Sequence, residues 1–323
     1  HMTLDERMWT GGPMVTGKPL FYRHAVRPVR GWRDDGLDVT AAVQEVDHNA
    51  AEPGDLHPRY LGRLDRQRAV TLEFDKPLDT YNKHGHNNPV LLADGWVEYP
   101  YSQTVFAAWQ ADERYFAPTL EAAGADGQWH TVYPSFGYPA GMPRQMSVPL
   151  EGLPQGTRKL RIRSNLQIYW DRLAVIYPQE PADGVIRTEL GLQRATVSQS
   201  GFARRTNGSQ QRPQYDYQDR VPFWDTRYPA GYYTRLGDAL PLAQKVDGAF
   251  IVIGPGEEVQ LDFQALPPGP DGWTRRYVLY TAGYAKDMDM YTQDSGTVGP
   301  LPLSPTANHA LHEQYNTRHR QGF

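Results

Sequence analysis

One pattern of alternating residues occurs twice in this chain and constrains its fold more than any other feature. Residues 70–96 read VTLEF, a polar connection and VLLADGW, and residues 259–284 read VQLDF, a Pro/Gly-rich connection and VLYTAGY. The second segment of each copy ends in glycine followed by an aromatic residue, Trp96 or Tyr284. Alternation with a period of two is typical of half-buried strands, and a repeated pattern indicates a repeated structural unit. The chain is therefore expected to contain two related β units.

The residue composition favours short strands joined by many turns. The chain of 323 residues contains 20 Tyr, 8 Trp, 30 Gly and 27 Pro. Aromatic side chains pack well on pleated surfaces, whereas Gly and Pro interrupt strands and helices. We predict an all-β protein with two sandwich-like units of jelly-roll type, long loops and few short helices.

Turn-forming residues divide the chain. The segment YPQEPADG at 177–184 has the composition of a linker between domains. We expect an irregular N-terminal segment over 1–19, a first β-sandwich domain over 20–180, a second over 185–300, and a C-terminal tail over 301–323.

Individual elements follow from the local patterns. The apolar spacing predicts short helices at 38–46 and 307–315, and the dense Arg, Gln, Tyr and Pro residues between Arg204 and Tyr233 predict a long loop. The local patterns predict strands at 21–29, 69–74, 90–97, 104–110, 119–123, 128–133, 145–150, 185–192, 195–200, 246–253, 258–263 and 276–284. Within 158–176 they predict two strands, separated by a turn at Ser164-Asn165.

Composition also excludes several classes of protein. No run approaches the roughly 18–20 consecutive apolar residues of a membrane-spanning helix. The net charge is −4 and the basic residues are dispersed, which disfavours a nucleic-acid partner. The absence of cysteine rules out disulfides, thiolate catalysis and cysteine-ligated zinc. The leading His-Met is typical of a cleaved tag, so the missing signal peptide says nothing about location.

Several motifs occur in the same order as in a known family: GWVEYPYSQT, FGYPAGMPRQMSVPL, LRIRSNLQIYWDRLAV, YYTRLGD, GPGEEVQLDF, GWTRRYVLYTAGYAKDMDMYT and EQYNTR. From about Leu20 to Arg318 the chain resembles the C-terminal region of bacterial FG-GAP-repeat proteins related to the ASPIC/UnbV family and cartilage acidic protein. The resemblance implies a fragment of a larger exported protein, located in the periplasm or outside the cell. The chain lacks the D-x-D-G calcium loops of the propeller repeats and the Gly-rich ASPIC/UnbV segment, so the propeller's calcium binding and adhesion do not transfer.

A second resemblance points to a metal. The segment LRIRSNLQIYWDRLAVI is similar to the last strand pair of galactose-binding-like jelly rolls, in which an Asp lies beside a structural calcium. Asp171 is the matching residue, and its partners would be Glu73 or Asp75. Asp287 and Asp289 are two residues apart and could also bind a hard cation through oxygen. The alternatives are a carboxylate bonded to Arg or backbone at Asp171, and a capped turn at 287–289.

Two histidines form the other candidate metal site. His84 and His86 lie in KHGHNN, and imidazole suits zinc, copper, iron or nickel. A further ligand would come from His48, His57, His130 or a carboxylate, because zinc sites need three or four ligands. The alternative is a solvated loop. The expected cofactor is a divalent metal, calcium first and zinc or copper second, or none.

Aromatic residues are the candidate ligand-binding groups. Exposed rings stack on sugar faces, and a pocket with a few polar groups is the usual form of a ligand site. The alternative is that the rings fill the sandwich cores. The candidates are Trp96, Tyr99, Tyr101, Tyr215, Tyr217, Trp224 and Tyr228.

No catalytic signature accompanies these residues. The chain contains no G-x-S-x-G, H-E-x-x-H, P-loop or G-x-G-x-x-G motif. The sequence therefore predicts a non-catalytic binding or structural module of a larger exported protein, with a glycan or cell-surface protein as partner and no nucleic acid or membrane span. The alternatives are a metal-dependent or glycan-active enzyme, and a scaffold that braces a β-propeller.

Overall fold

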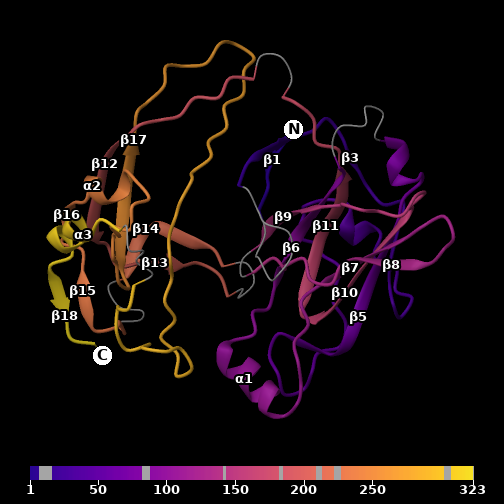
Figure 1. The fold of residues 1–323 in the computed structure, drawn as a ribbon, viewed down its shortest axis with the longest axis horizontal. Coiled ribbons are helices and arrows are strands. Elements are labelled where there is room, and N and C mark those ends of the chain that lie inside the picture. The colour runs from indigo at the N-terminus through magenta and orange to yellow at the C-terminus, as the bar shows by residue number, and fades with distance from the viewer. Residues whose placement is uncertain are drawn as a thin grey trace. The chain divides into compact units, whose positions relative to one another are not determined.

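The computed structural model describes residues 1–6, 17–81, 88–140, 143–181, 185–208, 213–221, 227–301 and 307–322 (Figure 1). The chain forms two compact units. Unit 1 contains the described residues up to Val185, and unit 2 contains the described residues from Ile186 onward. Strands dominate both units, which confirms the predicted all-β class.

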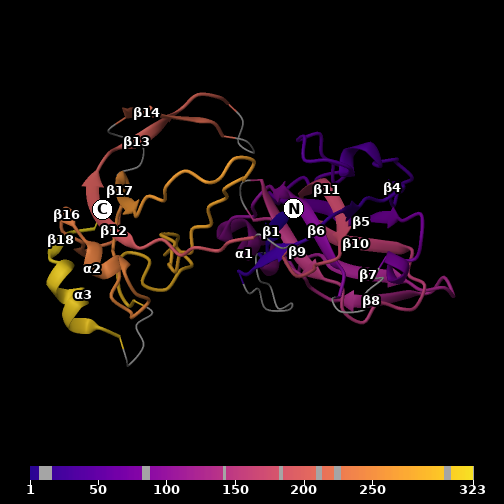
Figure 2. The same cartoon turned by 90° about the horizontal axis from the view of Figure 1, so that it is seen from above.

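Unit 1 is a sandwich of two antiparallel sheets. The five-stranded sheet has the order β4-β5-β10-β7-β8, and the four-stranded sheet has the order β3-β11-β6-β9. Figure 2 shows the five strands side by side in this order. The bounds are β3 Ala25–Val26, β4 Arg30–Arg33, β5 Arg63–Glu73, β6 Val90–Val97, β7 Thr119–Ala123, β8 Trp129–Tyr133, β9 Arg144–Pro149, β10 Lys159–Leu166 and β11 Ile168–Ile176.

The core of unit 1 lies between the two sheets. Leu72 and Leu160 come from the five-stranded sheet, while Leu91 and Leu173 come from the four-stranded sheet, and all four belong to one buried cluster. Burial of a leucine-sized side chain contributes roughly 1.5–3 kcal/mol. The contact between inward faces of two sheets is what defines a sandwich.

The alternation of β10 fixes what each face of its sheet presents. Leu160 and Ile162 are buried in the core, so Lys159, Arg161 and Arg163 point to the opposite face. This arrangement places three cations in a row on the outside of unit 1.

The two copies of the repeated pattern do not fold alike. In the first copy, residues 70–73 lie in β5 and residues 90–97 form β6, which belong to opposite sheets of the sandwich. In the second copy, β17 (Glu257–Phe263) forms, but residues 276–284 form no strand. The prediction of two related strand pairs is therefore wrong, because the second segment pairs with no strand among the described residues.

Unit 2 is built from smaller sheets. One sheet has the order β16-β12-β17, and two others are the pairs β13-β14 and β15-β18. Leu242, Ala249 and Tyr315 form a small buried cluster. The remaining bounds are β12 Leu192–Gln199, β13 Phe202–Arg205, β14 Tyr215–Val221, β15 Gly231–Tyr233, β16 Gly237–Asp238, β18 Arg318–Arg320, α2 Leu240–Ala243 and α3 His309–Tyr315.

Several sequence expectations about helices require correction. Residues 104–110 were expected to form a strand and instead lie in α1 (Ser102–Gln110), because Ala107, Ala108 and Gln110 are good helix formers. The helix expected at 38–46 is only a 3-10 turn, η1 (Ala41–Val43). A second 3-10 turn, η2, spans Leu78–Tyr81. None of the described helices has the length and apolarity required to cross a bilayer.

Several predictions about strands and loops also require correction. Residues 185–191 and 246–253 form no strand. The long loop expected between Arg204 and Tyr233 instead contains parts of the β13–β14 hairpin. The N-terminal segment is not wholly irregular, because β1 (Met2–Leu4) pairs with β2 (Pro19–Phe21). The C-terminal helix expected at 307–315 forms as α3.

Candidate functional site

The outer face of the four-stranded sheet in unit 1 is covered by the N-terminal residues. Ser147 Oγ donates to Asp5 Oδ1 at 2.8 Å, and the backbone N–H of Glu6 donates to Ser147 Oγ at 3.1 Å. Leu20 and Tyr22 pack on an outward cluster that includes Leu92. The chain itself therefore occupies much of this face.

The outer face of the five-stranded sheet carries large polar and aromatic side chains. Strand register aligns Trp32, Thr71, Arg161, Glu121 and Thr131 in one row across the sheet. The adjacent row contains Arg30, Glu73, Lys159, Ala123 and Trp129. We call this surface the aromatic–cationic face and define it by Arg30, Trp32, Glu73, Glu121, Trp129, Lys159, Arg161 and Arg163.

The two tryptophans lie at opposite edges of the aromatic–cationic face. Trp32 is on edge strand β4 and Trp129 is on edge strand β8, four strand intervals apart. Strands lie ~4.8 Å apart, so the backbones of these two edge strands are separated by ~19 Å across the sheet. Both side chains are half-buried, so each ring is supported by neighbours while part of it still meets solvent.

Cations hold both rings in place. The guanidinium of Arg30 lies 4.8 Å from the centroid of Trp32, and the ammonium of Lys159 lies 5.8 Å from it. The guanidinium of Arg161 lies 4.1 Å from the centroid of Trp129. Cation–π contacts of this kind contribute roughly 0.5–1 kcal/mol at exposed sites.

The two carboxylates of the face are paired with these cations. Glu121 accepts from Arg161 Nε at 2.5 Å and from Arg163 Nη1 at 3.5 Å, and its side chain is only 10% exposed. Glu73 lies 3.7 Å from Lys159 Nζ. The face therefore carries four cations and two carboxylates, a formal excess of two positive charges on a chain whose net charge is −4.

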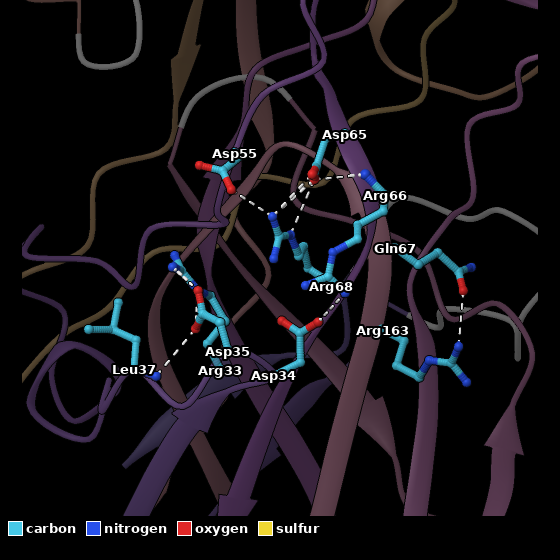
Figure 3. Close-up of polar contacts among 10 residues, drawn as sticks. All are labelled: Arg33, Asp34, Asp35, Leu37, Asp55, Asp65, Arg66, Gln67, Arg68 and Arg163. Atoms are coloured by element: carbon cyan, nitrogen blue, oxygen red, sulfur yellow. Dashed lines mark hydrogen bonds and ion pairs between the residues drawn. The ribbon is translucent and has the colours of Figure 1, made fainter.

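A second group of charges lies beside this face, near the start of β5 (Figure 3). Arg68 is buried and reaches Asp55 at 2.8 Å and Asp65 at 3.1 Å, and Arg66 reaches Asp34 at 3.0 Å. Arg163 extends toward the same region and donates to Gln67 at 3.1 Å. This group ties two loops to β5.

The remaining ion pair of this group contains an aspartate with a lowered pKa. Arg33 and Asp35 form an ion pair, and the hydrogen bond from Arg33 lowers the pKa of Asp35 to about 2. Unlike Lys159 and Arg163, whose nearest carboxylates lie at 3.7 and 3.5 Å, the arginines of this group each have a carboxylate within 3.1 Å. We interpret the group as structural.

The predicted aromatic residues of unit 1 do not form a single site. Trp96 is only 3% exposed and stacks on Tyr169 with the ring centroids 5.4 Å apart, so it has no free face for a ligand. Tyr99 and Tyr101 are exposed and make an edge contact at 6.5 Å, just before α1.

The predicted aromatic residues of unit 2 lie in two places. Tyr215 and Tyr217 are exposed on β14 with their centroids 6.2 Å apart. Tyr228 is half-buried, and the guanidinium of Arg320 lies 4.8 Å from its ring. Trp224 lies outside the described residues.

The predicted metal ligands are not brought together. Asp287 is exposed, and Asp289 Oδ1 accepts from the backbone N–H groups of Tyr291 and Thr292, both at 2.8 Å, as in a capped turn. His84 and His86 lie outside the described residues. Within the described ranges, no three His, Asp or Glu residues converge in a way that could hold a metal ion.

Asp171 occupies a β-bulge on β11, where its carboxylate is buried. The backbone N–H groups of His48 and Asp47 bond to this carboxylate, and His48 Nδ1 lies 3.9 Å from Oδ2. Burial is the largest influence and raises the pKa of Asp171 above its ordinary value. His48 has a φ of 68°, which is uncommon for a residue other than glycine. Asp171 thus anchors the turn at 47–48, and among the described residues it belongs to no group of three potential metal ligands.

Sequence reasoning missed the aromatic–cationic face. Its signal was the alternation KLRIR at 159–163, which implies three cations on one side of a strand. Neither Trp32 nor Trp129 could be assigned to the same face from sequence, because they come from strands 97 residues apart along the chain.

Comparisons of the chain with protein-family models, with curated proteins and with solved structures give no match.

Proposed function

We propose that this protein is a non-catalytic glycan-binding module and that the aromatic–cationic face of unit 1 is its binding surface. The observation that carries the proposal is the placement of Trp32 and Trp129 at opposite edges of one polar sheet face. A sugar ring presents an apolar C–H face that packs on an aromatic ring, and its hydroxyl groups require hydrogen-bonding partners beside that ring.

The spacing of the two rings favours an extended ligand. The strands that carry Trp32 and Trp129 are ~19 Å apart, from four strand intervals, and this spacing favours a ligand longer than a single sugar. Between these two strands lie Thr71 of β5 and the charged side chains of β10, all of which can donate or accept hydrogen bonds. An oligosaccharide laid across the strands would contact both rings and these groups together.

The contacts of the two carboxyl groups support binding rather than hydrolysis. A glycosidase needs one carboxylic acid with a raised pKa that can donate a proton. Glu121 is held by two arginines and Glu73 lies beside a lysine. Both carboxyl groups already contact hydrogen-bond donors of the face, so their oxygens are suited to accept further hydrogen bonds from hydroxyls.

The test is a glycan array followed by calorimetry on the full chain. We expect the wild-type protein to bind at least one oligosaccharide, and Trp32→Ala and Trp129→Ala each to weaken that binding about tenfold or more, the equivalent of ~1.4 kcal/mol. Trp109→Ala is the matched control, because Trp109 is an exposed tryptophan on α1 outside the face.

Two results would contradict the proposal. Failure of the wild-type protein to bind any glycan removes the function itself. Unchanged affinity in both face variants, with circular dichroism confirming that they fold, removes the assignment of the surface.

The module is further proposed to belong to a larger exported protein, with the ordered family-like motifs as the support. Fractionation of the source cells with an antibody against this chain tests that part. Recovery in the cytoplasm alone would overturn it.

A further inference from the structure

Three cations form a line along the middle of the aromatic–cationic face. Lys159, Arg161 and Arg163 occupy alternate positions of β10, the central strand of the five-stranded sheet. Alternate residues of a strand lie about 6.8 Å apart. Arg30 adds a fourth, exposed cation on β4.

The three cations differ in how fully their charge is compensated. Arg161 is engaged on both sides, by Glu121 at 2.5 Å and by the ring of Trp129 at 4.1 Å. Lys159 and Arg163 are each 42% exposed, and their nearest carboxylates lie at 3.7 and 3.5 Å. Ion pairs this long and this exposed are weak, so both head groups can bind a ligand at little cost.

The neighbouring group of charges does not share this excess of positive charge. In the adjacent group, Arg33, Arg66 and Arg68 are matched by Asp34, Asp35, Asp55 and Asp65, which leaves one negative charge in excess. The face itself has four cations against Glu73 and Glu121. A local positive strip beside an acidic border selects ligands whose negative charge is also arranged in a line.

We infer that the ligand is an acidic glycan, one whose sugars carry carboxylate or sulfate groups; this inference rests on the glycan-binding function proposed above. The guanidinium of Arg163 can hold such a group through two parallel hydrogen bonds, and the ammonium of Lys159 adds a point charge. The tryptophans at the edges then contact the sugar rings. A nucleic-acid duplex fits poorly, because its phosphates would also meet the acidic border and a chain of net charge −4.

The test uses a glycan array in which each uronate-bearing, sialylated or sulfated oligosaccharide is paired with its neutral parent. The best acidic member, its neutral parent and a short DNA duplex are then titrated calorimetrically into the full chain. We expect the acidic member to bind about tenfold or more tightly than its parent, since hydrogen bonds between charged groups are the strong ones. This preference should shrink as salt rises.

Substitutions separate charge from stacking. Lys159→Gln and Arg163→Gln remove a charge but keep a hydrogen-bonding group, so each should weaken binding of the acidic member several-fold more than binding of the neutral parent. Trp129→Ala should weaken both ligands. Arg66→Gln is the matched control, because Arg66 is an exposed arginine outside the face that is paired with Asp34.

The possible contrary results distinguish failure of the acidic-ligand inference from failure of the glycan-binding function. Equal binding of acidic and neutral partners overturns the acidic ligand and leaves the glycan-binding function intact. Equal binding of the DNA duplex and the acidic glycan reduces the face to a general cationic surface and also overturns the inference. No binding to any array member, acidic or neutral, means that the proposed function fails as well.

Discussion

The Arg161 guanidinium lies 4.1 Å from the ring centroid of Trp129, and its Nε donates to Glu121 at 2.5 Å. One side chain of β10 is thus bound to residues on both β7 and β8. Because a planar guanidinium can stack on a ring while it donates in its own plane, the contact fixes the orientation of Trp129 before any ligand arrives. Such preorganisation lowers the entropic cost of binding.

The first prediction concerns the energy of this contact. Arg161→Met keeps an unbranched side chain over Trp129 but leaves the nearly buried Glu121 with only the longer bond to Arg163. We expect the free energy of unfolding to fall by about 1–3 kcal/mol in urea denaturation, since a buried acceptor loses its main donor. The double variant Arg161→Met/Glu121→Gln should lose less stability than the sum of the losses in the two single variants. The difference, which is the coupling energy, should be roughly 0.5–3 kcal/mol.

Arg66→Met serves as the control for this cycle. The ion pair between Arg66 and Asp34 is more exposed, and its loss should stay within about 0.5 kcal/mol. Strict additivity of Arg161→Met and Glu121→Gln would show that the two side chains do not act together.

The second prediction concerns a buried carboxylate in unit 2. The side chain of Glu257 is 0% exposed and accepts from Arg318 at 2.5 Å and from the backbone N–H of Gly254 at 2.9 Å, with Arg320 as a further donor. It links β17 to the C-terminal strand β18. Glu257→Gln leaves two arginines without their carboxylate, and breaking a buried pair in this way costs about 3–5 kcal/mol.

Chemical denaturation followed by hydrogen exchange of β12, β17 and β18 measures this loss. Glu258→Gln is the neighbouring control, because Glu258 is an exposed partner of Arg220 at 3.0 Å and should cost within about 1 kcal/mol. Equal losses in the two variants would mean that Glu257 does not hold the C-terminal strand.

The third prediction decides between an anchor and a metal ligand at Asp171. Asp171→Asn keeps an oxygen acceptor for the N–H groups of Asp47 and His48 and removes a charge that burial disfavours. It should therefore stay within about 1 kcal/mol of the wild-type stability, whereas Asp171→Ala should lose about 1–3 kcal/mol. Burial raises the pKa of Asp171 in the folded state. The carboxyl group therefore destabilises the folded protein least at a pH below its unfolded-state pKa, and most at a pH above its folded-state pKa.

Melting curves with EDTA and with added calcium complete this experiment. An anchoring carboxylate gives the same melting temperature in both conditions. A rise with calcium in the wild-type protein that disappears in Asp171→Asn would restore the calcium interpretation.

The sequence predicted unit 1 better than unit 2 for a physical reason. Residues 119–123, 145–150 and 158–176 alternate, and they form strands because each has a neighbouring strand edge and a core to face. Alternation reports how a segment would pack and not whether a partner edge exists. Residues 276–284 are also rich in strand-forming Tyr and Val, yet they form no strand.

The same limit explains why the sequence did not reveal the aromatic–cationic face. The cations at 159, 161 and 163 are visible in sequence as an alternating row, but their neighbours depend on the strand order β4-β5-β10-β7-β8. Trp32 and Trp129 join the face only through that order and its register. The aromatic residues that sequence favoured were chosen by local density, and Trp96 among them is buried against Tyr169.

The last prediction tests the unpaired segment directly. Residues 276–284 make no strand pairing in the structure, and Tyr280 at its centre is 79% exposed. Their amides should exchange with deuterium within seconds, as expected for backbone without protecting hydrogen bonds. The peptides of β12 and β17, which pair over residues 192–199 and 257–263, provide the protected reference within the same unit. Slow exchange at 276–284 would show that this segment joins a sheet edge in solution, as its sequence predicts, and β17 would then be the first edge to examine.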